Sequence, residues 1–231
     1  RSEVNSSISV SCKPLTAGSC FRMTLYALTL FLGAFLLFLV QPIVARYMLP
    51  WFGGSPGVWT TCLLFFQVML LIGYGFAHCI VRRLQPRLQS ALTLALLILT
   101  SATLPVAPSR SWLPQNASNP AWHILKLLLL SVGACYFLLA SSSPLLQSWF
   151  SRPSRPGSSP YRLYTVFNFG SLIAVVAYPF WIEPYLGLSQ QTRLWSLLYI
   201  VFGGLGAICA LRMWTTPVLQ GISPAFAAEG N

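Results

Sequence analysis

Charged residues are scarce in this sequence, and acidic residues are the scarcest. Of its 231 residues, 7% are Asp, Glu, Lys or Arg, and only three are acidic. A soluble domain is about one quarter charged, so this chain has too few charges to cover a water-facing surface. Because 55% of its residues are hydrophobic and its mean hydropathy is +0.68, the composition predicts an integral membrane protein.

Paired metal-binding residues are missing as well. The two histidines, His78 and His123, stand far apart and are expected near opposite faces of the membrane, which excludes a shared haem. The six cysteines form no C-x-x-C motif. Those in apolar segments are expected to be small buried hydrophobes: Cys62, Cys79, Cys135 and Cys209. Cys12 and Cys20 fit either free thiols or a disulfide. The sequence thus predicts no metal and no cofactor.

Positive charge is the exception to this scarcity, with fourteen Lys and Arg residues and a net charge of +11. In a soluble protein such an excess would suggest a nucleic-acid partner. No basic helix or aromatic stacking platform accompanies it here. We therefore expect no nucleic-acid binding, and we assign the positive charge to loops that fix the orientation of membrane helices.

Six apolar runs are long enough to be considered as membrane spans. The third is the weakest, since it is short and ends at Pro105. The predicted fold is an all-α integral membrane domain over residues 23–213, between a polar N-terminal tail (1–22) and a C-terminal tail (214–231). The expected spans are 23–49, 56–81, 88–107, 121–150, 162–186 and 192–213.

The distribution of basic residues predicts which way these spans run. With both termini in the cytoplasm, four basic residues lie outside: Arg46, Arg110, Lys126 and Arg193. The other ten lie inside: Arg1, Lys13, Arg22, Arg82, Arg83, Arg87, Arg152, Arg155, Arg162 and Arg212. This bias follows the positive-inside rule and predicts cytoplasmic termini.

One short stretch, Gly53-Gly54-Ser55-Pro56-Gly57, matches the G-x-S-x-G pattern of serine hydrolases. That motif needs a strand before the serine and a helix after it. Here it joins two apolar runs at the outer face. The favoured interpretation is a helix–turn–helix loop in which Gly53 and Gly54 make the turn, Ser55 caps the second helix and Pro56 begins it. No catalytic residue is predicted.

Polar residues inside apolar runs are costly and require an explanation. Arg46 and Glu183 are expected at similar depth near the outer face. Two interpretations stand: the residues form an ion pair, or each reaches the headgroups independently.

The uncharged polar residues fall into two expected layers. Gln41 and Gln67 lie in the outer half, and a serine run and an asparagine lie in the inner half: Ser141, Ser142, Ser143 and Asn168. The favoured interpretation is interhelical hydrogen bonding. The alternative is a substrate path lined by the same groups.

Two segments resemble the membrane region of bacterial fused MFS/spermidine-synthase-like proteins. They are residues 38–78, which include "FLVQPIVARYMLPWFGG", and residues 138–187, which include "LYTVFNFGSLIAVVAYPF". The resemblance implies a six-helix unit similar to one MFS half, in the bacterial cytoplasmic membrane. The family commonly carries a spermidine-synthase-like domain further along the chain. No Gly-rich nucleotide loop or carboxylate pair follows the sixth run here, so no catalytic residue is carried over.

Three functions follow as hypotheses. The first is a non-catalytic membrane module that serves as an accessory or scaffold subunit among other membrane proteins. The second is the membrane portion of a spermidine-synthase-like aminopropyltransferase. The third is a half-size MFS-like transporter, which would need a homodimer or a second half. The first is favoured, with the lipid bilayer and other membrane subunits as partners.

Overall fold

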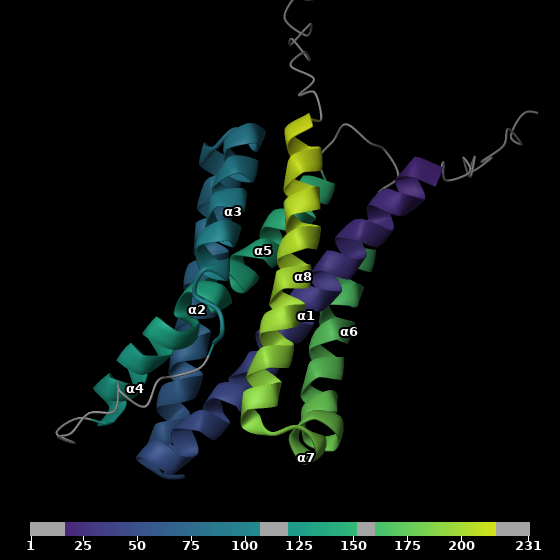
Figure 1. Cartoon of the computed structure of the whole chain (residues 1–231). Helices are drawn as coiled ribbons and strands as arrows, with labels where there is room; N and C mark the ends of the chain where they lie inside the picture. The colour runs from purple at the N-terminus through teal and green to yellow at the C-terminus, as the bar shows by residue number, and fades with distance from the viewer. Residues whose placement is uncertain (1–16, 107–119, 152–159, 216–231) are drawn as a thin grey trace, which may run out of the picture.

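A computed structural model describes residues 17–106, 120–151 and 160–215, which form a bundle of helices with no strand in these ranges (Figure 1). Five helical segments are long and apolar enough to cross a membrane. This confirms an all-α protein of multi-pass membrane type. The five segments are Phe21–Phe52, Pro56–Arg83, Pro120–Phe150, Tyr161–Tyr185 and Leu188–Thr215.

The first two helices, α1 (Ala17–Phe52) and α2 (Pro56–Arg83), are joined by the Gly-rich loop. The α1 helix begins six residues before its expected start at 23. Gly53 has a φ of 78°, a left-handed conformation that glycine adopts without strain. Ser55 is the N-cap residue of α2 and Pro56 follows at N1, as expected, but the Ser55 side chain makes no capping hydrogen bond. Its backbone carbonyl accepts from Val58 N–H at 3.1 Å instead. The stretch is therefore helix–turn–helix in this structure.

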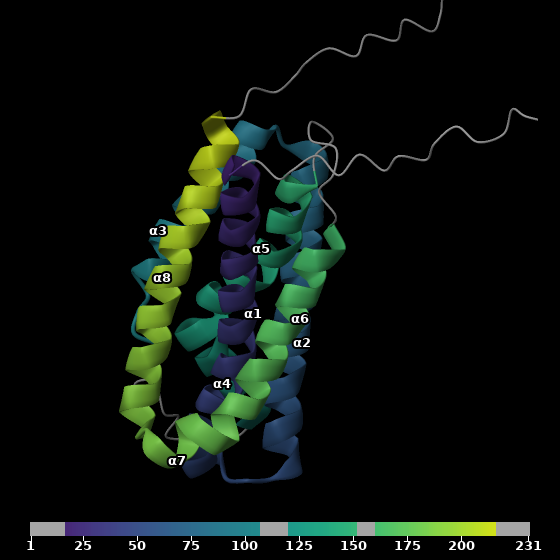
Figure 2. The same ribbon diagram turned by 90° about the vertical axis from the view of Figure 1, so that its right-hand side faces the viewer.

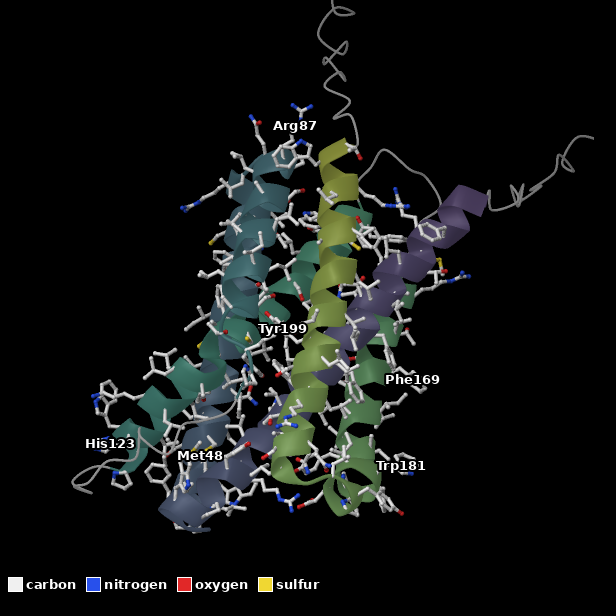
Figure 3. The ribbon with its side chains drawn as sticks, in the orientation of Figure 1. Met48, Arg87, His123, Phe169, Trp181 and Tyr199 are labelled. Carbon is white, nitrogen blue, oxygen red and sulfur yellow. The ribbon has the colours of Figure 1, made fainter. Side chains whose placement is uncertain are left out.

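The third helix, α3 (Pro86–Ser101), is shorter than its expected span of 88–107. Its 16 residues rise about 24 Å, less than the roughly 30 Å of a hydrocarbon core, and it is not among the five long segments. The chain nevertheless changes ends between α3 and α4 (Pro120–Leu128). Figure 3 places Arg87, at the start of α3, at one end of the bundle and His123, in α4, toward the other.

Two of the three remaining expected spans each contain a π-helical segment. In the first, α4 continues through η2 (Leu129–Gly133) into α5 (Ala134–Phe150). In the second, α6 (Pro160–Ala177) continues through η3 (Tyr178–Ile182) into α7 (Glu183–Tyr185). Pro179 lies in η3 and lacks an N–H, and the Glu183 N–H donates to the Tyr178 carbonyl in the wider π pattern.

The last helix, α8 (Leu188–Thr215), runs back along α1 and α3. The α1 helix is central, with α5, α6 and α8 packed against it, while α2 packs on α5 (Figure 2). Two glycines allow the closest approaches. A Cβ on Gly73 would lie 2.7 Å from Ala140 Cβ, and a Cβ on Gly170 would lie 2.6 Å from the Phe31 carbonyl oxygen. Small residues thus bring α2 against α5 and α6 against α1.

Candidate functional site

The ion pair predicted as one of two alternatives is present in the structure. Arg46 Nη1 on α1 lies 3.6 Å from Glu183 Oε1 on α7, and the two side chains are 38% and 46% exposed. The Tyr178 hydroxyl lies close enough to interact electrostatically with both. Neither this hydroxyl nor Arg46 Nη1 makes a well-formed hydrogen bond, although both atoms are buried. The contact is therefore a loose, partly exposed pair that ties the end of α1 to α7.

Gln41 makes an interhelical hydrogen bond, but not in the expected layer with Gln67. Its Nε2 donates to Tyr136 Oη on α5 at 3.3 Å and to the Leu37 carbonyl at 3.4 Å. Gln67 faces outward on α2 and is exposed. Sequence analysis does not single out Tyr136, because a tyrosine within an apolar run is not distinguished from the hydrophobic residues around it. Its hydroxyl is the polar group that Gln41 meets.

The inner layer of serines and Asn168 is not formed as predicted. Ser141 and Ser142 are buried, and their hydroxyls donate to carbonyls of their own helix at 3.0 and 2.8 Å. Ser143 accepts from Gln147 Nε2 on the same helix at 3.2 Å. Asn168 is exposed on α6. The expectation was wrong because a serine hydroxyl in a helix reaches the carbonyl three or four residues earlier without a partner helix.

Gln89 is a buried polar residue that sequence analysis missed. Its side chain is fully buried, and its Oε1 accepts from Trp149 Nε1 on α5 at 2.9 Å. Its Nε2 donates to the carbonyls of Leu84 at 2.8 Å and Ile80 at 3.3 Å, at the end of α2. Gln89 therefore satisfies helix-end carbonyls of α2 while it joins α3 to α5.

A second missed set of contacts lies at the centre of the bundle, where Figure 3 labels Tyr199. Tyr199 Oη on α8 donates to Thr100 Oγ1 on α3 at 2.7 Å. Cys135 Sγ on α5 lies 3.6 Å from the Thr100 carbonyl oxygen. Nearby on α8, Trp195 Nε1 donates to the Leu36 carbonyl of α1 at 3.0 Å. These bonds hold α8 against α1 and α3.

The cavity between α3, α5 and α8 is narrow and apolar, with room for about one water molecule. Its lining includes Leu97, Leu138 and Phe202. A cavity of this size and chemistry suits no polar substrate.

The cysteines are free thiols in the part of the chain that the structure describes with side chains. Cys62, Cys135 and Cys209 are buried as expected, whereas Cys79 is exposed. Cys12 and the Cys20 side chain lie outside that part. Within the described ranges no group of three or more His, Cys, Asp and Glu residues is placed to hold a metal ion.

The hydrogen bonds of Gln41, Gln89, Trp195 and Tyr199 tie helices to one another, whereas those of the α5 serines stay within one helix. The strongest candidate for an interaction site is the outward-facing side of α2 and α6, where Gln67 and Asn168 are exposed. Comparisons with models of known protein families, with curated proteins and with solved structures found no match.

Proposed function

We propose that this chain is a six-crossing membrane module with both ends in the cytoplasm, and that it serves as a non-catalytic accessory or scaffold subunit of a larger membrane assembly. The observation that carries the proposal is the contrast between its interior and its outside. Among the described residues, the cavity between α3, α5 and α8 is narrow and apolar and has room for about one water molecule. The outside of α2 and α6 presents amides as well as apolar side chains.

The sixth crossing is the stretch between Gln85 and Pro120. Since α3 starts at the end of the bundle where α2 finishes, and α4 starts toward the opposite end, the chain has to pass from one end to the other in between (Figure 1). The α3 helix covers about 24 Å of this path.

The orientation is supported by charge. Among the described residues, the end where α3 begins carries six arginines: Arg22, Arg82, Arg83, Arg87, Arg162 and Arg212. The opposite end carries three basic residues, Arg46, Lys126 and Arg193, together with Glu183. The positive-inside rule then assigns the arginine-rich end to the cytoplasm. If the resemblance to bacterial proteins holds, the membrane is the bacterial cytoplasmic membrane.

An accessory role is supported by the helices at the edge of the bundle. Leu172 and Val175 in α6 and Phe180 in η3 are more than half exposed, and in α2 the same is true of Leu63 and Leu71. Such surfaces face either lipid or other membrane helices. A module that binds neighbouring subunits needs surfaces of this kind and no reactive centre of its own.

The experiment that tests this proposal is a measurement of the native particle mass. The chain is extracted from its own membranes in a mild detergent, and the co-purifying proteins are identified. A large complex of fixed composition is the expected result. A particle that contains only this chain, at one or two times 25.5 kDa, would overturn the accessory role.

The resemblance over residues 38–78 and 138–187 favours a second candidate, the membrane portion of a spermidine-synthase-like aminopropyltransferase. A co-purifying protein with aminopropyltransferase activity would favour this candidate over a purely structural role. The hydrogen bond between Gln41 and Tyr136 favours the third, a half-size transporter, because it places polar groups between α1 and α5. Uptake of a solute by vesicles that contain only this chain would favour it.

A further inference from the structure

The buried polar side-chain atoms that lack a partner belong to one corner of the bundle. Among the described residues, three such nitrogen or oxygen atoms are buried without a hydrogen bond: Arg46 Nη1, Tyr178 Oη and Gln191 Oε1. One comes from α1, one from η3 and one from α8. A buried polar atom without a hydrogen bond is unfavourable, and most such atoms in proteins have a partner. The place where these elements meet is therefore a candidate binding site.

All three side chains are tied to α7 or to the turn that follows it. Arg46 Nη1 lies 3.6 Å from Glu183 Oε1, and the Glu183 N–H donates to the Tyr178 carbonyl across one π turn. Gln191 Nε2 donates to the Leu186 carbonyl, just after α7, at 2.9 Å. Tyr178 and Gln191 are 8% and 1% exposed, so both are shielded from bulk water. We call Arg46, Tyr178, Glu183 and Gln191 the α7 corner.

The α7 corner lies at the depth of lipid headgroups. Trp181 and Tyr185 stand on either side of Glu183 in the sequence, and both are more than half exposed. Exposed Trp and Tyr side chains are typical of the membrane–water interface. Figure 3 places Trp181 toward the end of the bundle opposite Arg87. The neighbouring Phe180 is also more than half exposed and offers apolar surface to an acyl chain. A lipid of this leaflet is therefore the nearest source of a ligand.

The α7 corner offers both signs of charge and both kinds of hydrogen-bonding group. Arg46 and the Tyr178 hydroxyl are donors for an anionic oxygen, whereas Glu183 and Gln191 Oε1 are acceptors for a cationic N–H. The 3.6 Å between Arg46 and Glu183 exceeds the about 2.7–2.9 Å of a charge-assisted hydrogen bond. A partly exposed pair of this kind contributes little to stability. A ligand that carries an anion next to an ammonium can therefore bind both residues without the loss of a strong contact.

We propose that the α7 corner binds the headgroup of a zwitterionic phospholipid that carries a primary ammonium, as phosphatidylethanolamine does. The phosphate oxygens accept from Arg46 and Tyr178, and the ammonium donates to Glu183 and Gln191. A quaternary ammonium has no N–H to donate, and a glycerol headgroup has no positive charge to pair with Glu183. This inference goes beyond the accessory role, because a lipid site is independent of which other subunits the chain binds.

The test measures how phospholipids stabilise the purified chain. The whole chain is held in an uncharged detergent, and short-chain phosphatidylethanolamine, phosphatidylcholine or phosphatidylglycerol is added while thermal unfolding is followed by circular dichroism. A ligand that binds only the folded state raises the unfolding temperature according to its affinity, so the titration gives an apparent Kd. We expect phosphatidylethanolamine to bind about 10-fold more tightly than the other two lipids, the equivalent of one charge-assisted hydrogen bond.

Two variants separate the ammonium contact from the phosphate contact. Glu183→Gln is expected to remove the preference for phosphatidylethanolamine over phosphatidylcholine, because the carboxylate no longer pairs with the ammonium. Tyr178→Phe is expected to weaken the binding of both lipids by about 3- to 10-fold and to leave the preference in place. Tyr178→Phe should not lower the stability in lipid-free detergent, since the hydroxyl has no hydrogen bond within the described residues to lose.

The matched controls are Arg193→Gln and Tyr161→Phe. Arg193 is exposed near the start of α8, and Tyr161 is exposed near the start of α6. Neither belongs to the α7 corner, so both variants are expected to leave the three apparent Kd values unchanged. Arg46→Gln, in contrast, is expected to weaken the binding of all three lipids, because each of them carries a phosphate.

Equal affinity of the unaltered chain for the three lipids would overturn the proposal and leave ordered water as the partner of the buried atoms. An undiminished preference in Glu183→Gln, or unaltered binding in Tyr178→Phe, would overturn it as well. Soluble glycerophosphoethanolamine carries the same headgroup without acyl chains and is expected to bind much more weakly. Stabilisation by this compound as strong as that by the lipid would overturn the lipid as the ligand and assign the site to a soluble zwitterion.

Discussion

At the scale of single residues, the buried amide of Gln89 joins α3 both to α5 and to the end of α2. We expect Gln89→Leu to lower the free energy of unfolding by about 1–3 kcal/mol. The substitution leaves Trp149 Nε1 buried without its acceptor and removes the donor from the Leu84 carbonyl. Thermal unfolding in detergent, followed by circular dichroism, measures the loss.

The partner substitution Trp149→Phe tests whether the effect comes from this hydrogen bond. The losses in Gln89→Leu and Trp149→Phe should not add in the double variant, because both remove the same 2.9 Å contact. Trp214→Phe is the matched control, since Trp214 is 45% exposed at the end of α8. Strict additivity would show that the two residues stabilise the protein separately.

The ion pair between Arg46 and Glu183 should contribute much less to the free energy of unfolding than the hydrogen bonds of Gln89 do. Its atoms are 3.6 Å apart and both side chains are partly exposed, so we expect Glu183→Gln to change the free energy of unfolding by less than about 1 kcal/mol. Unfolding at low and high salt is the measurement, and the small effect should shrink as salt rises. A loss above about 3 kcal/mol would instead be typical of a buried pair.

At the scale of helices, packing depends on glycines that let two backbones approach. We expect Gly170→Ala to destabilise the protein by about 1–3 kcal/mol, because its Cβ would lie 2.6 Å from the Phe31 carbonyl oxygen and α6 would have to move away from α1. Gly204→Ala is the control. Gly204 on α8 has nothing within 4 Å, so its substitution should be neutral or slightly stabilising. Equal destabilisation by both variants would contradict this account.

The elements also show how far the sequence predicts this fold. Long apolar runs between Pro, Gly and Arg predicted five helices to within a few residues, because in a membrane each backbone amide has to be satisfied within its own helix. The end of α3 was not predictable from the run 88–107. The chain leaves the helix after Ser101, and Thr103 Oγ1 contacts Cys135 Sγ on α5 at 3.5 Å while Val106 is buried. That contact depends on a helix remote in sequence.

The polar residues were predicted less well than the helices. The positions of Arg46 and Glu183 in their apolar runs predicted similar depths in the membrane. The ion pair that the structure contains was therefore one of two predicted alternatives. It could not tell which side of a helix Gln67 and Asn168 face, because hydrophobic residues surround both. In a membrane protein the lipid side and the core side are both apolar, so the period that identifies the buried face of a soluble helix is weak here.

At the scale of the whole molecule, the decisive question is whether the chain crosses the membrane between α3 and α4. We expect Ser55→Cys and Ala121→Cys to react with a membrane-impermeant maleimide in intact cells. Gln85→Cys should react only after permeabilisation. The physical reason is that the α1–α2 loop and the start of α4 lie toward one end of the bundle, and the α2–α3 loop lies toward the arginine-rich end (Figure 1).

The three positions are exposed, and the comparison is made in a background in which Cys12, Cys20 and Cys79 are Ser. Mass spectrometry of the labelled chain gives the fraction modified at each site. Suppose that Ala121→Cys were labelled only after permeabilisation, as is expected for Gln85→Cys. The segment 86–119 would then return to its starting side, and the chain would cross the membrane five times. Because α4 to α8 would then be inverted, Arg162 and Arg212 would lie outside and the positive-inside bias would be lost. The proposed six-crossing topology accounts for both the position of α4 and the distribution of the arginines.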